Sequence, residues 1–308
     1  MNLPLKSKQK LILFFALILP LSFAAGAGAE TGQAPMAIST AHRDLAKRKA
    51  AALPAGTGEF LLFSTAALVQ DQENATILFE KNQDRVQPIA SITKLMTALV
   101  TLDAELDLNE TLSIGMADVD RLRHTGSRLA VGARLTRMEL LRLALMSSDN
   151  RAAAALGRHY PHGTTAFVRA MNMRAASLGM ESTHFVEPTG LSAHNVSSAR
   201  DLAKLVVAAA RYPLIREWTQ TPEHTLRING QPQTFRNTNL LVRDESWEID
   251  VTKTGYIGAA GKCLVMQAWL DKKPMVIVIL DAWGPMTRVG DAMRVKEWIE
   301  SVARRERK

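Results

Sequence analysis

The sequence contains one cysteine, Cys263, in 308 residues. A single cysteine excludes an intrachain disulfide, and its place in the apolar stretch 263–266 predicts a core residue rather than a nucleophile. The sequence also lacks blocks of lysine and arginine interleaved with aromatic residues, which argues against nucleic-acid binding. The seven histidines are scattered. Only His159 and His162 lie close together, and Pro161 breaks helical spacing between them, so no metal site is predicted.

Residues 1–29 have the features of a secretory signal peptide. Three lysines precede an apolar run from Leu11 to Phe23, and Ala27-Gly28-Ala29 forms a small-x-small cleavage site. The run is too short for a membrane anchor, which needs about 20 apolar residues. Removal of this segment would lower the net charge from +8 to +5. The chain is therefore predicted to be exported.

The rest of the chain is predicted to form one domain. Residues 30–57 are rich in alanine, glycine, lysine and proline and are interpreted as a linker. The domain should span 58–303, since 47% hydrophobic and 22% charged residues are typical of a globular chain with a substantial core. The basic tail 304–308 would contact an anionic membrane surface at most peripherally.

Strand patterns occur near both ends of this domain, with helix patterns between them. The predicted strands are 66–70, 76–80, 251–255, 262–268 and 275–282. Helices are expected over 165–178, over 199–211 up to Pro213, and over the last part of the domain, about 292–302. The two ends should therefore meet in one antiparallel sheet with a helical subdomain between them, an α/β (α+β) arrangement.

The segment 88–100 predicts an amphipathic helix with a polar pair at its start. Apolar residues recur from Ile92 to Val100 at the spacing of one helical face. Ser91 and Lys94 are three residues apart and therefore meet on one side of the first turn. Backbone N–H groups and the helix dipole there favour an anion beside Ser91. A capping Ser91 with a solvated Lys94 is the simpler alternative.

Two further polar motifs lie downstream in the sequence. Ser148-Asp149-Asn150 lies in the turn after a helix that starts at the capping box Thr136-Arg137-Met138-Glu139. Lys253-Thr254-Gly255 lies at a predicted strand end. Each motif alone fits an ordinary turn. In this order after Ser91-x-x-Lys94, they are the motifs of class A β-lactamases and penicillin-binding proteins.

With these motifs the chain resembles the low-molecular-mass penicillin-binding proteins, which are serine D-alanyl-D-alanine peptidases. The resemblance covers residues 60–302 and extends to the segments 185–191, 197–201 and 237–241. Within the family the chain is most similar to the periplasmic D-alanyl-D-alanine endopeptidases, which cut peptide cross-links in peptidoglycan. The resemblance implies a serine β-lactamase/DD-peptidase-like fold, a periplasmic location, no cofactor, and peptidoglycan peptides and β-lactam antibiotics as ligands.

The chemistry of the side chains in these motifs also predicts catalytic roles, independently of the resemblance. Ser91 would be the nucleophile, and Lys94 its base because the motifs contain no histidine. Burial, the helix dipole and the charge of Lys253 would lower the pKa of Lys94. Ser148 would pass a proton to the leaving amine, and Asn150 would present its amide to the substrate backbone.

The third motif is predicted to bind the substrate. Lys253 and Thr254 would hold a terminal carboxylate, and Gly255 would leave room for the substrate to lie along the strand. By resemblance, the backbone N–H groups of Ser91 and Tyr256 would form the oxyanion hole. Arg236 is a further candidate carboxylate contact.

Three other functions remain open on the sequence. A D-alanyl-D-alanine carboxypeptidase attacks the same D-Ala carbonyl and differs in the group that this carbonyl is bonded to. A class A-like β-lactamase would need a carboxylate that activates water, and Glu181 and Glu187 do not sit in that class's loop pattern. A non-catalytic peptidoglycan-binding protein would not need every polar position of the three motifs, and here all are filled.

Overall fold

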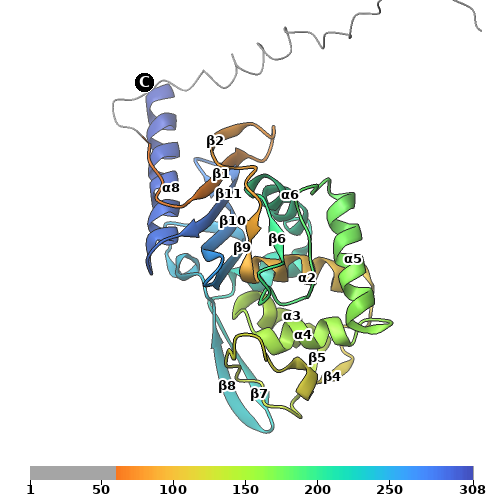
Figure 1. Cartoon of the computed structure of the whole chain (residues 1–308). Helices are drawn as coiled ribbons and strands as arrows, with labels where there is room; N and C mark the ends of the chain where they lie inside the picture. The colour runs from red at the N-terminus through yellow and green to blue at the C-terminus, as the bar shows by residue number, and fades with distance from the viewer. Residues whose placement is uncertain (1–59, 308) are drawn as a thin grey trace, which may run out of the picture. The chain divides into compact units, whose positions relative to one another are not determined.

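The computed structural model describes residues 60–307, and the arrangement of its elements is shown in Figure 1. The predicted signal peptide, 1–29, and the predicted linker, 30–57, lie outside the described residues.

A five-stranded antiparallel sheet is built from both ends of the described chain. Its strands are β1 (Ala66–Asp71), β2 (Ile77–Lys81), β9 (Glu248–Ile257), β10 (Gly261–Leu270) and β11 (Lys273–Ala282). Their spatial order is β2-β1-β11-β10-β9, so N-terminal and C-terminal segments pair directly, with Val69 opposite Ile277. The predicted sheet is confirmed, and β9 lies at its edge.

Helices and short hairpins fill the chain between β2 and β9. The helices are α2 (Thr93–Asp103), α3 (Arg137–Met146), α4 (Asn150–Arg158), α5 (Gly163–Ser177), α6 (Ala199–Ala209) and α7 (Pro213–Gln220). The 3-10 turns are η1 (Ala90–Ile92), η2 (Met116–Asp118) and η3 (Leu240–Arg243). Two-stranded pairs join β3 (Gln87–Pro88) to β6 (Val196–Ser197), β4 (Thr111–Ser113) to β5 (Arg134–Thr136), and β7 (Glu223–Ile228) to β8 (Gln231–Arg236).

The sheet is covered on both faces, as Figure 1 shows. Helix α8 (Thr287–Glu306) packs on one face against β10 and β11, and α6 packs on the other against β1, β10 and β11. Two separate hydrophobic clusters correspond to these two faces. Burial on both sides explains why β11 has an uninterrupted apolar run from Met275 to Leu280 rather than an alternating pattern.

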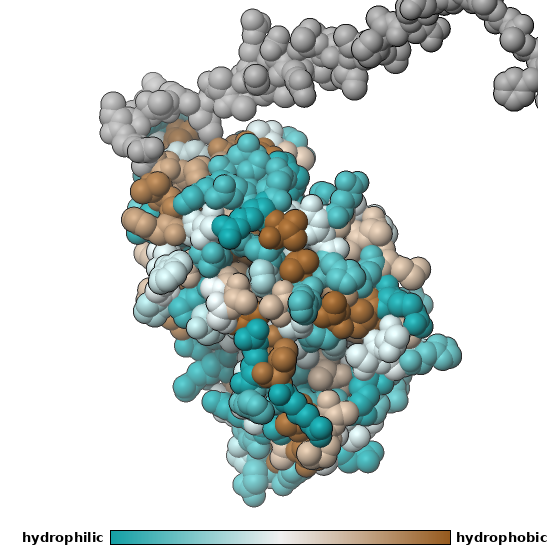
Figure 2. Space-filling model, viewed as in Figure 1, coloured by the Kyte–Doolittle hydropathy of each residue, from teal (hydrophilic) through white to brown (hydrophobic). Residues whose placement is uncertain are grey.

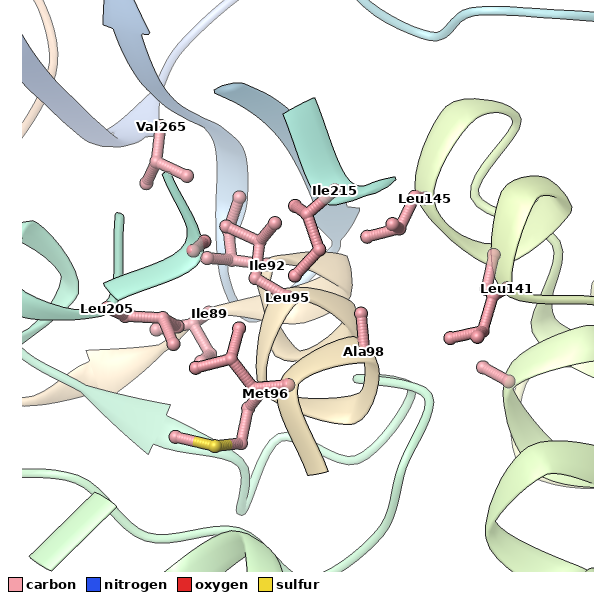
Figure 3. Packing of buried hydrophobic residues seen from close by; sticks show 14 of the residues in the cluster. Ile89, Ile92, Leu95, Met96, Ala98, Leu141, Leu145, Leu205, Ile215 and Val265 are labelled. Atoms are coloured by element: carbon pink, nitrogen blue, oxygen red, sulfur yellow. The ribbon is translucent and has the colours of Figure 1, made fainter. Parts of the chain in front are cut away.

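Helix α2 lies at the centre of the larger cluster. Ile92, Leu95 and Met96 are fully buried, and Figure 3 shows them surrounded by side chains of α3, α6, α7 and β10. The apolar repeat of 88–100 therefore faces neighbours on several sides. This packing fixes the position of the helix start, and with it the position of Ser91 and Lys94.

Several predicted boundaries differ from the structure, and two of these differences have a clear structural consequence. Pro213 was expected only to end a helix, but it also begins α7, because proline at the first helical position gives up no backbone hydrogen bond. The helix α8 continues to Glu306, so most of the predicted tail 304–308 is helical, and Arg307 contacts Asp271. Cys263 is buried as expected, and burial raises the pKa of its thiol to about 11.

The surface shown in Figure 2 carries small hydrophobic groups separated by hydrophilic residues. Among residues 60–307, no helix has the length and apolar character required to span a bilayer.

Candidate active site

Ser91 lies in a strained turn at the start of α2. Its neighbour Ala90 has φ of +48°, an uncommon conformation for a residue with a side chain. The turn places the Ser91 Oγ 2.9 Å from the Lys94 Nζ. The predicted pairing of Ser91 with Lys94 on the first turn is therefore observed, and the solvated Lys94 of the simpler alternative is wrong.

Lys94 is fully buried and its amine is surrounded by oxygen atoms. Besides the Ser91 Oγ, its Nζ donates to the Asn150 Oδ1 at 2.7 Å and to the Thr189 carbonyl at 2.5 Å. A neutral amine keeps two N–H groups for Asn150 and Thr189 and turns its lone pair to the Ser91 hydroxyl. The geometry thus allows Lys94 to accept the proton of Ser91.

Burial lowers the pKa of Lys94 to about 8. The carboxylates of Glu187, Asp149 and Asp120 act in the opposite direction and limit the shift. The expected repulsion between Lys94 and Lys253 acts on Lys253: burial, and then the charges of Lys94 and Arg288, lower the pKa of Lys253 well below its ordinary value.

A loop held by Glu187 forms one wall of the site. The Glu187 carboxylate accepts hydrogen bonds from the backbone N–H groups of Thr189 and Gly190 and from the Asn195 side chain. Gly190 has φ of +82°, and a Cβ there would lie 2.0 Å from the Ala90 carbonyl oxygen. Only glycine permits this approach. The loop therefore positions the Thr189 carbonyl that Lys94 binds.

Strand β9 forms the opposite wall. A Cβ on Gly255 would lie 2.9 Å from the Ile89 carbonyl oxygen and 3.1 Å from the Ser91 nitrogen. Gly255 is therefore required for the strand to contact the Ser91 turn, which differs from the expected role of leaving room for substrate. The contact also brings the backbone of Tyr256, the next residue, toward the Ser91 turn.

The buried side chains of the third motif lie beside a cation that sequence reasoning missed. The Lys253 Nζ donates to the Thr254 carbonyl at 3.1 Å, and the Thr254 Oγ1 donates to the Thr238 Oγ1 at 2.6 Å. Arg288, from α8, donates to the Gly255 carbonyl at 3.1 Å. It has no carboxylate partner among the described residues. Nothing in the sequence near Arg288 marks it, because it reaches the site through tertiary packing.

The turn that carries Ser148 and Asn150 contacts the site, but the hydrogen bonds of Asn150 differ from those predicted. Asn150 does not hold its amide free for substrate: its Oδ1 accepts from Lys94, and its Nδ2 donates to the Thr125 Oγ1 at 2.9 Å. Ser148 has φ of +60°, and its hydroxyl forms no hydrogen bond within residues 60–307. It is therefore available to a bound ligand.

The side chains of the remaining candidates lie outside this centre. Tyr256 has its side chain exposed, with the Lys262 Nζ 4.4 Å from its ring centroid. Arg236 is on the β7–β8 hairpin, 3.4 Å from Glu223, and has no contact with Lys253. The His159 Nε2 lies 3.3 Å from the Ser113 carbonyl.

Comparison with known proteins agrees with this geometry. Residues 57–284 match the sequence model of the D-alanyl-D-alanine carboxypeptidases, and the chain belongs to this family of serine hydrolases. The predicted family and enzyme class are confirmed.

Individual relatives cover most of the chain. The D-alanyl-D-alanine endopeptidase of Pseudomonas aeruginosa is 50% identical over 242 residues, which are 78% of each chain. The protein of the same name from Escherichia coli is 47% identical over 240 residues, 77% of each chain. The crystal structure of the Streptomyces K15 DD-transpeptidase has a TM-score of 0.73 at 27% identity, with 78% of this chain and 98% of that chain covered. The expected DD-peptidase-like fold is confirmed.

Proposed function

We propose that this chain is a D-alanyl-D-alanine endopeptidase that hydrolyses the peptide cross-links of peptidoglycan through an acyl-enzyme on Ser91. The observation that carries the proposal is the buried Lys94 amine 2.9 Å from the Ser91 hydroxyl. The names of the Pseudomonas and Escherichia relatives support the choice of substrate. The family binds peptidoglycan peptides and β-lactams, and we expect both to acylate Ser91.

Acylation begins with neutral Lys94. The amine takes the Ser91 proton while the Ser91 Oγ forms a bond to the D-Ala carbonyl carbon. The tetrahedral oxyanion would be stabilised by the backbone N–H groups of Ser91 and Tyr256. The C–N bond then breaks, and the leaving amine receives the proton from Lys94 through the Ser148 hydroxyl. Water subsequently hydrolyses the ester, which frees Ser91.

Substrate orientation depends on a carboxylate at the third motif. Lys253 is buried, has no salt bridge within residues 60–307, and has its pKa held well below the ordinary value by burial, whereas Arg288 remains protonated in any protein environment. An entering carboxylate would compensate the charge of Arg288 and favour protonation of Lys253. It would also accept a hydrogen bond from the Thr254 hydroxyl, which would turn away from Thr238 to donate it. We therefore assign Arg288 to the carboxylate site together with Lys253 and Thr254.

Cleavage of a single terminal D-Ala is the second candidate, because the matching family model describes carboxypeptidases. A β-lactamase function is less compatible with the site. The Glu187 carboxylate is occupied by backbone and Asn195 donors and is not free to activate water. We further propose that the chain is exported to the periplasm and loses residues 1–29, since its expected substrate lies in the cell wall.

The proposal is tested with fluorescent penicillin and purified muropeptides. We expect a long-lived covalent adduct that is absent from Ser91→Ala, and cleavage of cross-linked dimers by the unsubstituted enzyme. Labelling of Ser91→Ala would contradict the nucleophile. Release of D-Ala from monomeric pentapeptides with no cleavage of dimers would favour the carboxypeptidase, and rapid turnover of nitrocefin would favour the lactamase.

A further inference from the structure

A hollow adjoins the candidate active site on the side of Ser148. It is lined by residues from three separate segments of the chain. These include Ser127, Arg128, Ser148, Asp149, Phe235 and Arg236. The hollow therefore lies between the segment 126–128, the turn after α3, and the end of strand β8.

Thr238 links one wall of the hollow to the carboxylate site by hydrogen bonds. The backbone N–H of Thr238 donates to the Met146 carbonyl at 3.1 Å, which holds the end of the β7–β8 hairpin against the turn that carries Ser148. The Thr238 hydroxyl accepts a hydrogen bond from Thr254 at 2.6 Å. Consider a leaving group whose carboxylate is held at Thr254 and whose amine faces Ser148. The third substituent on the carbon that carries these two groups would then lie beside the hollow.

The charges around the hollow favour an anionic ligand. Arg236 has 71% of its side chain exposed, and its pairing with Glu223 is a weak contact between exposed groups. Arg128 lies over the Phe235 ring at 5.7 Å from its centroid and donates to the Thr234 carbonyl. The one carboxylate in the wall, Asp149, is already bound by the Ser127 hydroxyl and the Ala152 N–H.

The proposed reaction determines which substituent of the leaving group would lie beside the hollow. A carboxypeptidase expels D-alanine, whose side chain is a methyl group. Cleavage of a cross-link through diaminopimelate instead expels that residue, which has a carboxylate beside the freed amine and a longer arm that leads to the rest of the second peptide, with that peptide's own carboxylates. That arm begins at the same carbon as the methyl group of D-alanine, beside the amine that Ser148 would protonate. It needs space and cationic partners next to Ser148.

We propose that this hollow binds the leaving half of the cross-link, with the Arg236 guanidinium pairing with a carboxylate on its arm. The inference rests on the proposed endopeptidase function and adds to it the group that distinguishes a cross-linked substrate from a single terminal D-Ala. Arg128, fixed by Phe235 and the Thr234 carbonyl, shapes the floor and supplies the second positive charge.

The test compares substrates that differ only in the leaving group. Arg236→Gln removes the charge from an exposed hairpin position, so the fold should persist. We expect kcat/KM for a cross-linked muropeptide dimer to fall about tenfold, mainly through KM, as for loss of one charged recognition contact. The value for a monomeric pentapeptide should change less than about twofold, since D-alanine does not reach Arg236. Arg236→Glu should reduce dimer cleavage further. Added salt should narrow the difference in dimer cleavage between the unsubstituted enzyme and the Arg236 variants.

The matched control is Arg227→Gln on the same hairpin. Residues 223 and 227 lie on one face of β7, and Arg227 is about 13 Å nearer the tip than the pair of Glu223 and Arg236. Within the described part of the chain, the Arg227 side chain has its one hydrogen bond with the Gly230 carbonyl, and it does not line the hollow. Its substitution should leave dimer cleavage unchanged.

The outcomes separate this inference from the function on which it rests. Unchanged dimer cleavage by Arg236→Gln, or an equal loss on dimer and pentapeptide, would overturn the role of the hollow while leaving the endopeptidase function in place. If the unsubstituted enzyme is acylated by penicillin but leaves the dimer intact, both the endopeptidase function and the role of the hollow are overturned.

Discussion

The two sides of the candidate site are built in different ways. The inner side, formed by Ser91, Lys94, the loop 187–190 and Gly255, is mostly buried and permits almost no added atom. The outer side, formed by the β7–β8 hairpin and the segment 126–128, is largely exposed and held by a few polar contacts. Figure 1 shows the hairpin extending away from the sheet. The inner side has the rigidity that proton transfer needs, while the outer side can vary with the substrate.

The largest effect is expected from Lys94→Met on the inner side. Acylation by fluorescent penicillin should slow by about 10²- to 10⁴-fold, because the Ser91 hydroxyl loses its base. Lys272→Met, at an exposed turn, is the control and should acylate normally. Stopped-flow labelling measures both rates. A loss of less than tenfold in a folded Lys94→Met would assign the base elsewhere.

Two glycine substitutions compare the sides directly. Gly190→Ala places a Cβ 2.0 Å from the Ala90 carbonyl oxygen, and we expect it to lower the free energy of unfolding by about 3 kcal/mol and to slow acylation. Gly230→Ala, at the hairpin tip with φ of +79°, meets no atom within 4 Å. It should cost only the backbone strain, about 1–2 kcal/mol, with normal acylation. Denaturant unfolding measures the loss in the free energy of unfolding for each variant. Equal losses for Gly190→Ala and Gly230→Ala would contradict the distinction between the two sides.

The pH dependence of acylation reports on the charges of the inner side. With the pKa of Lys94 lowered to about 8, the rate should be half-maximal near that pH and fall about tenfold per unit below it. The negative charge of Glu187 raises this pKa, so Glu187→Gln should move the midpoint to lower pH by less than about one unit. A midpoint that stays in place or moves upward would contradict this assignment.

The smallest effect is expected on the outer side. Thr225 and Thr234 form an exposed cross-strand pair with their hydroxyl oxygens 2.8 Å apart. Thr225→Val should change the free energy of unfolding by at most about 0.5 kcal/mol and leave acylation unchanged. Thermal unfolding and penicillin labelling measure the two quantities. Slower acylation would show that the hairpin transmits strain to Ser91.

The sequence predicted the features that depend on near neighbours. The spacing of Ser91 and Lys94 on one helical turn, the capping box at Thr136, and the strand patterns at both ends were each read from a few adjacent residues, and each is observed. The order of three motifs then indicated the family. Local spacing is enough for these features because a helix or strand fixes the direction of successive side chains.

Tertiary packing determined what those groups contact. The bond from Lys94 to Asn150 joins residues 56 positions apart, and the bond to Thr189 joins residues 95 apart. Arg288 reaches β9 from the last helix, and the reason for glycine at 190 and 255 is the backbone packed against each. No periodicity encodes such contacts, because they arise only when α2 is enclosed between the sheet and the other helices. The same enclosure lowers the pKa of Lys94, so the sequence determined which amine lies beside Ser91, and the fold decided that it can act as a base.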